Sequence, residues 1–420
     1  MKKILNIGPM GFRDAPDKTG GIVVFYQEWL EYCDGAGVEY CSIDTNKSNY
    51  ANKIAVVFGL GPAGLFLARQ LKLLGYKAYG IGKVDDIGKY SNVLEQYWEA
   101  EDKQAVVAAV SGIVKQYGKG VEAWICSDQY LTLFIEECSE VFSLLDFSKP
   151  GERILRLIAD KKALMAYCAK IGVHFPERYT INDIDSIEYP VVVKPNIKHG
   201  SSPIKKINFA DSMNELQTLL DYAKANQLSD EQLIIQKSVA GNNGAEYGYG
   251  GYFRDGKAIN DVYFLQARQY PQGVCCYTIE LTDENIKLEI AEQVQRLITE
   301  LKYTGFLQFD LKKDSNTGKL YVLDINPRPW GSVSMLSRKC GAKSVFEPNP
   351  ELSTKECWRF PLKELMAFSN KNNVAYAECR RLKRFGHYKT TLDLWDRHDM
   401  KPFFMQPVIT FMKLIKRVQA

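Results

Sequence analysis

The chain of 420 residues lacks the sequence features of zinc-binding and membrane-spanning proteins. Its ten cysteines include no CxxC pair, so the ligand spacing of a structural zinc site is absent. No run of about 18 apolar residues occurs, which predicts that the chain has no transmembrane helix. Asn6, Gly8 and Pro9 interrupt the first apolar run, which argues against a signal peptide. We therefore expect a cytoplasmic protein whose cysteines are reduced thiols.

The chain also lacks a large excess of positive or negative charge. The 54 basic and 50 acidic residues give a net charge of +4 and are mixed along the chain, which gives no indication of nucleic-acid binding. Apolar residues make up 46% of the sequence and charged residues 25%, which is ordinary for globular proteins. We find no internal repeat and no low-complexity tract. The length allows two or three domains with cores of their own.

The first part of the chain alternates short apolar runs with helical periodicity, which predicts a small parallel α/β domain over residues 51–147. A linker is expected over residues 145–152. The expected strands are 53–58, 76–81 and 121–126, and the expected helices are 65–74 and 102–117.

Beyond the linker the pattern changes to mainly antiparallel α+β, which predicts a second domain over residues 148–345 and a less regular extension over 346–420. The expected helices are 160–171, 211–225 and 283–301. The expected strands are 190–194, 204–208, 232–237, 245–253, 258–266, 305–313 and 319–325.

The most informative segment is a predicted hairpin formed by residues 305–313 and 319–325. Asp324 and Asn326 are two residues apart and share one side of their strand, and Asp310 on the neighbouring strand can point to the same face. Three oxygen-bearing side chains suit a magnesium ion, which completes its octahedron with water and phosphate oxygens. Arg328 follows, where a guanidinium can hold a carboxylate or a phosphate. The alternative is a solvent-exposed hairpin with ordinary acidic residues.

The stretch LYVLDINPRPWGS resembles the metal-binding signature of ATP-grasp enzymes such as biotin carboxylase and the carbamoyl-phosphate synthase large subunit. The resemblance implies a Rossmann-like domain followed by a two-lobed ATP-grasp domain that binds ATP with magnesium, or with manganese as an alternative. It implies that Asp310, Asp324 and Asn326 are the metal ligands and that Arg328 is catalytic. The family usually has glutamate at the position of Asp324, which leaves open whether one metal ion or two are bound.

The same resemblance assigns phosphate-binding residues upstream of the hairpin. Lys161, in the segment Asp160-Lys161-Lys162, corresponds to the first phosphate lysine, with Lys162 as the alternative in the alignment. Lys194, at the end of the strand VVVKP, corresponds to the second. The loop of residues 198–202 corresponds to the family's flexible glycine-rich loop, and its Gly200, Ser201 and Ser202 are expected to contact phosphates.

The adenosine part of the nucleotide is expected further along. Gln236, Lys237 and Val239 resemble the hinge strand that reads adenine, largely through the main chain. The ribose ligand is left open between Asn243 and Glu246. Arg268 resembles an arginine that faces substrate or phosphate, and a structural ion pair is the equal alternative.

Three other segments have weaker patterns. Gly59-x-Gly61-x-x-Gly64 is a Rossmann-type turn, which we interpret as part of the domain that precedes the grasp domain rather than as an NAD site. Residues 1–50 resemble the opening βαβ unit of a two-domain Rossmann glycosyltransferase. Residues 403–418 mix apolar and basic residues, which suits a helix packed on the body more often than one lying on a membrane surface.

The resemblance implies an ADP-forming ligase that phosphorylates a small-molecule carboxylate and joins the acyl-phosphate to an amine, or to another nucleophile such as a thiol. The alternatives are a carbamoyl-phosphate-like reaction on bicarbonate or carbamate, an ATP-binding partner protein without catalysis, and a glycosyltransferase. The identity of the substrates and the oligomeric state are left open.

Overall fold

The computed structural model describes most of the chain from residue 53 onward. The βαβ unit expected for residues 1–50 lies outside the described residues. The described ranges are 53–147, 149–196, 202–241, 246–270, 274–339, 344–348, 356–369 and 389–419.

The first sheet is parallel, as the sequence predicts, with strand order β3-β2-β1-β4. Its central strand is fully buried from Ala55 to Phe58, which explains its continuous apolar run. β3 was not predicted, because its residues are only partly buried or exposed and give no apolar run. The strands are β1 (Ile54–Phe58), β2 (Lys77–Gly82), β3 (Leu94–Glu99) and β4 (Glu122–Ile125), and the helices are α2 (Pro62–Leu73), α3 (Lys103–Tyr117), α4 (Asp128–Glu136) and α5 (Val141–Leu144).

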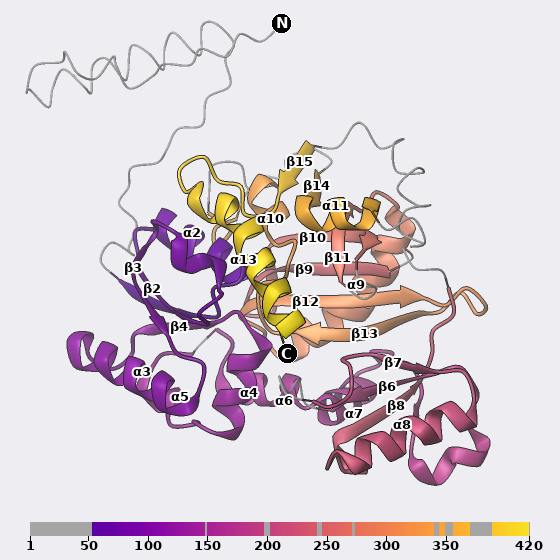
Figure 1. Cartoon of the computed structure of the whole chain (residues 1–420). Coiled ribbons are helices and arrows are strands. Elements are labelled where there is room, and N and C mark those ends of the chain that lie inside the picture. The colour runs from indigo at the N-terminus through magenta and orange to yellow at the C-terminus, as the bar shows by residue number, and fades with distance from the viewer. Residues whose placement is uncertain are drawn as a thin grey trace, which may run out of the picture. The chain divides into compact units, whose positions relative to one another are not determined.

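The second sheet is antiparallel, with strand order β5-β8-β6-β7, and α8 (Met213–Ala225) packs on it through Leu216 and Leu220 (Figure 1). The strand expected at 204–208 is instead β7 at Asn208–Ala210. The Asn208 side-chain amide donates to the backbone oxygen of Lys205 at 2.7 Å, which holds the preceding residues in a turn. The other elements are α6 (Glu152–Ala159), α7 (Lys161–Lys170), β5 (Arg178–Tyr179), β6 (Val191–Pro195) and β8 (Leu233–Lys237).

The third sheet has seven strands in the order β13-β12-β9-β10-β11-β14-β15, and all pairs except the parallel β14–β15 pair are antiparallel. Helix α9 (Glu284–Glu300) covers it through Ile290, Val294 and Leu297. The strands are β9 (Glu246–Arg254), β10 (Lys257–Gln269), β11 (Cys275–Glu280), β12 (Gly305–Lys313), β13 (Leu320–Asn326), β14 (Glu356–Arg359) and β15 (Lys389–Leu392), and α10 (Ser334–Lys339) follows β13.

The C-terminal segment is more regular than the sequence predicted, because β14 and β15 extend the third sheet. Helices α11 (Pro361–Ser369) and α13 (Lys401–Gln419) belong to the same segment. Ile409 of α13 packs with Leu65 and Ile87, which supports the expected packing on the body. Within the described ranges, every helix is too short or too polar to cross a bilayer. The predicted mixed α/β architecture is confirmed.

Candidate active site

The site is built on the β12–β13 hairpin. In its register Asp310 lies opposite Asp324 and Gln308 lies opposite Asn326, so these four side chains share one face of the sheet. The turn that joins the strands is fixed by Asp314, whose Oδ1 accepts hydrogen bonds from the backbone N–H groups of Asn316 and Thr317, each at 2.9 Å. The pairing of the carboxylates therefore follows from local strand geometry.

Asp310 is surrounded by amide groups. Its Oδ1 accepts hydrogen bonds from Gln266 Nε2 at 2.7 Å and from Gln308 Nε2 at 2.6 Å. Burial, with the nearby charge of Asp324, raises the pKa of Asp310 to about 6. The Oε1 atom of Gln308 accepts from Asn326 Nδ2 at 2.6 Å. Among the described residues, the direct partners of the Asp310 carboxylate are amide groups rather than cations, so a bound cation would favour its charged form.

Lysines from separate elements converge on this face. Lys161 Nζ lies 3.2 Å from Asp324 Oδ1, and Lys206 Nζ lies 3.9 Å from Asp324 Oδ2. Lys194 Nζ donates to the backbone oxygen of Leu323 at 3.4 Å. Burial, with the charge of Lys161, lowers the pKa of Lys194 to about 8. An anion beside these three ammonium groups would relieve their mutual repulsion, so the cluster suits a phosphate chain.

Local structure explains why Lys161, and not Lys162, points into the site. Asp160 caps α7 by accepting from the backbone N–H of Ala163 at 3.1 Å, which places Lys161 in the first turn. Asn196, just after β6, accepts from the backbone N–H of Lys162 at 3.0 Å and so ties the two elements together. The Lys162 ammonium points away and donates to the backbone oxygen of Glu231 at 2.8 Å.

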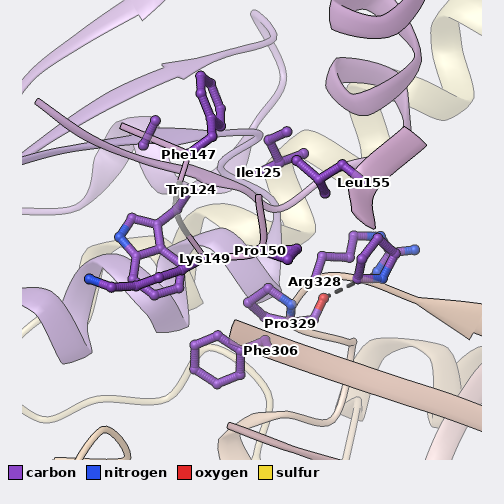
Figure 2. Close-up of a pocket in the computed structure, with 11 residues that line it drawn as sticks. Trp124, Ile125, Phe147, Lys149, Pro150, Leu155, Phe306, Arg328 and Pro329 are labelled. Carbon is purple, nitrogen blue, oxygen red and sulfur yellow. Dashed lines mark hydrogen bonds between the residues drawn. The ribbon is translucent and has the colours of Figure 1, made fainter. Parts of the chain in front are cut away.

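Arg328 is held by the first domain. Its Nε and Nη2 atoms lie 2.7 and 2.8 Å from Asp128 Oδ1 and Oδ2, a bidentate pair between residues 200 positions apart. Its Nη1 atom donates to the backbone oxygen of Pro329 at 3.1 Å, as Figure 2 shows. The charge and hydrogen bonds of Asp128 outweigh burial and raise the pKa of Arg328.

The cavity beside Arg328 in Figure 2 is too small for a substrate, since its volume is about 10 Å³, roughly that of one water molecule. The site itself opens into a much larger cleft of about 1590 Å³. That cleft is lined by Lys161, Lys194, Ser202, Lys206, Glu246, Gln266, Gln269, Gln308, Asp310, Asp324, Asn326 and Arg328, among others.

Arg268 is not among the residues that line this cleft, so its interpretation as a catalytic residue is not supported. Regular alternation would place it on the same face as Gln266, but the register of β10 with β11 shifts on both sides of Arg268. Its side chain is 3% exposed and forms an ion pair with Glu364. The structure thus favours the alternative of a structural ion pair.

The other predicted nucleotide residues lie in different places. Ser202 and Glu246 line the cleft, and Glu246 Oε2 accepts from Gln269 Nε2 at 2.6 Å. Gln236 is buried and donates toward the sulfur of Met165 at 3.2 Å, and Lys237 pairs with Glu188, so neither side chain reaches the cleft. Val239 is buried two residues beyond β8. Gly200, Ser201 and Asn243 lie outside the described residues.

Sequence reasoning missed Lys206, Gln266, Gln269 and Gln308. The strand period could have identified Gln308, which is two residues before Asp310. The bulges of β10 hide Gln266 and Gln269, because a shifted register breaks the period. Lys206 follows a loop with no recognisable pattern, so no sequence signal points to it.

The turn at residues 59–64 is held by hydrogen bonds and close packing within the first domain. Asp86 Oδ2 accepts from the backbone N–H groups of Leu60 at 2.8 Å and Lys83 at 3.1 Å. A Cβ atom on Gly64 would lie 2.0 Å from the backbone oxygen of Gly59, so glycine is required for close packing of α2. The glycine of this turn and its acidic neighbour thus have structural roles within the first domain.

The donor set fits magnesium. In the part of the chain that the structure describes, no three His, Cys, Asp or Glu side chains gather into a group that could hold a metal ion. Two facing carboxylates and an amide oxygen are few ligands, and magnesium bound with phosphates needs few, since water and phosphate oxygens complete its shell. Asp310, Asp324 and Asn326 could therefore hold the ion of a magnesium–nucleotide complex.

Comparison with known proteins gives a consistent result. The sequence model of the ATP-grasp domain matches residues 158–332. A carbamoyl-phosphate synthase of Methanobrevibacter smithii is 24% identical over 200 residues, which are 46% of this chain and 52% of that protein. The aligned segment thus spans about half the length of that curated relative.

Solved structures share the fold. An L-amino acid ligase from Bacillus licheniformis has a TM-score of 0.54 at 16% identity, covering 71% of this chain and 73% of its own. The biotin carboxylase domain of a Hydrogenobacter thermophilus 2-oxoglutarate carboxylase, in complex with MgADP, ADP and bicarbonate, has a TM-score of 0.54 at 15% identity, covering 71% and 69%. At these identities the likeness concerns the fold alone.

Proposed function

Because residues 158–332 belong to the ATP-grasp superfamily, we propose that the protein is an ADP-forming ligase that activates a small-molecule carboxylate with ATP and joins it to an amine. One observation carries the proposal. Lys161, Lys194 and Lys206 converge on the face that presents Asp310 and Asp324, within a single large cleft. Cations for phosphates and carboxylates for a divalent ion are what a magnesium–ATP complex requires side by side.

The lysines bind the phosphate chain in this proposal. Lys161 leaves Asp324 and turns to a phosphate oxygen when the nucleotide enters, since its flexible stem allows the ammonium group to change partner. Lys194 is fixed at the end of β6, and its lowered pKa means that a phosphate beside it also favours its charged form. Adenine lies near the main chain of Lys237 and Val239, and Glu246 is the described candidate for the ribose.

Asp310, Asp324 and Asn326 would hold the magnesium ion of the nucleotide. When bound, the ion neutralises negative charge on the phosphoryl group that is transferred. The raised pKa of Asp310 fits this role, because burial and the nearby charge of Asp324 both disfavour its charged form and a bound cation would favour it.

The chemistry needs no side-chain nucleophile. A substrate carboxylate oxygen bonds to the γ-phosphorus, the bond from that phosphorus to the β,γ-bridging oxygen breaks, and ADP leaves. The amine nitrogen then bonds to the acyl carbon while the carbon–oxygen bond to phosphate breaks, and the proton from nitrogen leaves with phosphate. Arg328, oriented by Asp128, stabilises the charge on the acyl-phosphate.

A second candidate is phosphorylation of bicarbonate or carbamate. The relative from Methanobrevibacter smithii is described as a carbamoyl-phosphate synthase, which is the observation that favours this candidate. It uses the same phosphate and magnesium residues, so the acceptor alone distinguishes the two reactions.

The test is substrate-dependent release of ADP by the full chain. Carboxylate and amine pairs are screened with magnesium–ATP, and bicarbonate with ammonia is screened in parallel. We expect ADP and phosphate to appear with a carboxylate and amine pair, and to disappear in Asp324→Ala. Release with bicarbonate but with no organic carboxylate would transfer the proposal to the second candidate. Undiminished release in Asp324→Ala would contradict the assigned metal site.

A further inference from the structure

The large cleft continues well beyond the phosphate-binding lysines. It reaches the far strands of the third sheet, where β11, β14 and helix α11 lie next to one another (Figure 1). Residues that line this end include Thr278, Trp358, Lys363 and Asp393. The proposed nucleotide chemistry uses none of them. We call this part of the cleft the distal compartment.

The sheet register places the polar groups of the distal compartment on one face. Thr278 of β11 lies opposite Trp358 of β14, and Trp358 lies beside Thr391 of β15. Asp393 follows Thr391 by two residues, and its backbone N–H continues the ladder by donating to the Arg359 oxygen at 2.8 Å. Strand alternation therefore places the side chains of Thr391 and Asp393 on the same side of the sheet.

Several buried polar atoms on this face lack a hydrogen-bond partner among the described residues. They are Trp358 Nε1, Thr391 Oγ1 and Asp393 Oδ2. Trp358 is 2% exposed and Asp393 is 3% exposed. Leaving such groups unsatisfied is unfavourable, so the two whose residues line the cleft, on Trp358 and Asp393, call for a ligand.

The chemistry of the unsatisfied atoms defines what would satisfy them. The buried Asp393 side chain accepts a hydrogen bond from Gln406, and the charges of Lys363 and Arg69 act on it from a distance. Its Oδ2 atom has no hydrogen-bond partner among the described residues, so a cation in direct contact would stabilise the charged form. Trp358 Nε1–H can only donate, so it needs an oxygen acceptor. Lys363, above the ring of Phe360 with its Nζ 4.7 Å from the ring centroid, is a second group that attracts an anion.

We propose that the distal compartment binds a substrate with a protonated amine beside a carboxylate, as in an amino acid, with the amine at Asp393 and the carboxylate at Trp358 and Lys363. This inference rests on the proposed function, which it deepens by naming the class of the cosubstrate. Burial raises the pKa of Asp393 to about 7 in spite of Lys363, which supports a need for a cation there. An anion alone or an uncharged sugar would leave the Asp393 carboxylate without that cation.

The binding test is calorimetric titration of the full chain with each proteinogenic amino acid, which does not depend on ATP turnover. For the tightest binder, the decarboxylated amine and the deaminated acid are titrated as probes that carry one group each. We expect both analogues to bind at least about tenfold more weakly, because each loses hydrogen bonds to a charged partner. Equal affinity of either analogue, or no binding of any amino acid, would overturn the proposal.

Two variants test the residues. Asp393→Asn keeps the size of the side chain and should weaken amino-acid binding about tenfold or more, while Trp358→Phe keeps an aromatic ring and should weaken it several-fold. Magnesium–ATP should stabilise both variants against thermal unfolding as much as the wild type. Unchanged amino-acid affinity in both variants would refute the assignment. If magnesium–ATP does not stabilise the wild type against thermal unfolding, that result counts against the proposed function. The calorimetric titration with amino acids would still decide this inference.

Discussion

The ion pair between Arg328 and Asp128 should couple the first domain to the hairpin energetically. Its two hydrogen bonds are 2.7 and 2.8 Å long, and its side chains are 18% and 23% exposed. A fully buried pair would lose about 3–5 kcal/mol when one partner is removed, but this exposure reduces the expected loss to about 2 kcal/mol for Asp128→Ala or Arg328→Ala.

A double-mutant cycle measures the coupling. If the two groups act mainly on each other, the double variant should lose little more than either single variant, which gives a coupling energy of about 2 kcal/mol. The four proteins are compared by urea unfolding with two spectroscopic probes. If the losses of the two single variants sum to the loss of the double variant within about 0.5 kcal/mol, the two residues act independently and the reasoning is refuted.

Three further changes test other parts of the account. Gly64→Ala should destabilise the protein by about 1–3 kcal/mol, because its Cβ would meet the Gly59 oxygen. Gly112→Ala lies in a helix with open space around it and should stabilise the protein by about 0.5–1 kcal/mol. Similar effects of the two variants on the free energy of urea unfolding would contradict this reasoning. Lys161→Ala should raise the KM for ATP about tenfold. Lys162→Ala, the matched control on the same helix turn, should leave the KM nearly unchanged. Equal KM values for the two variants would contradict the assignment of Lys161 to the phosphate site. The carboxyl of Asp393 has its pKa raised from 3.8 to about 7, so the folded state holds the proton more tightly, and stability falls as pH rises through that window. The stability advantage of Asp393→Asn over the wild type should therefore grow by up to roughly 4 kcal/mol between pH 4 and pH 8, and a constant difference would argue against the raised pKa.

The hairpin shows what could be predicted from the sequence. Its facing carboxylates follow from a period of two and a short turn, which are local properties of the segment. The central strands and α9 were predicted to within a few residues for the same reason, because their apolar patterns reflect burial on one or both sides.

The features that could not be predicted depend on distant contacts. Nothing near Arg328 indicates that Asp128 orients it, and nothing near Asp324 indicates Lys206. The bulges beside Arg268 reverse an expectation that a regular strand would justify. The distal compartment is formed by β11, β14 and β15, which contribute single polar residues rather than a motif.

The most direct test of the central claim is thermal unfolding of the wild type and Asp324→Ala, each with magnesium–ATP and with ATP plus chelator. A ligand that binds only the folded protein raises the unfolding midpoint by mass action. The account predicts a clear rise for the wild type with magnesium–ATP, and a smaller rise for the wild type with chelator and for Asp324→Ala under both conditions. No response of the wild type to magnesium–ATP, or an equal response of the variant, would contradict the claim that this face of the hairpin binds magnesium–ATP.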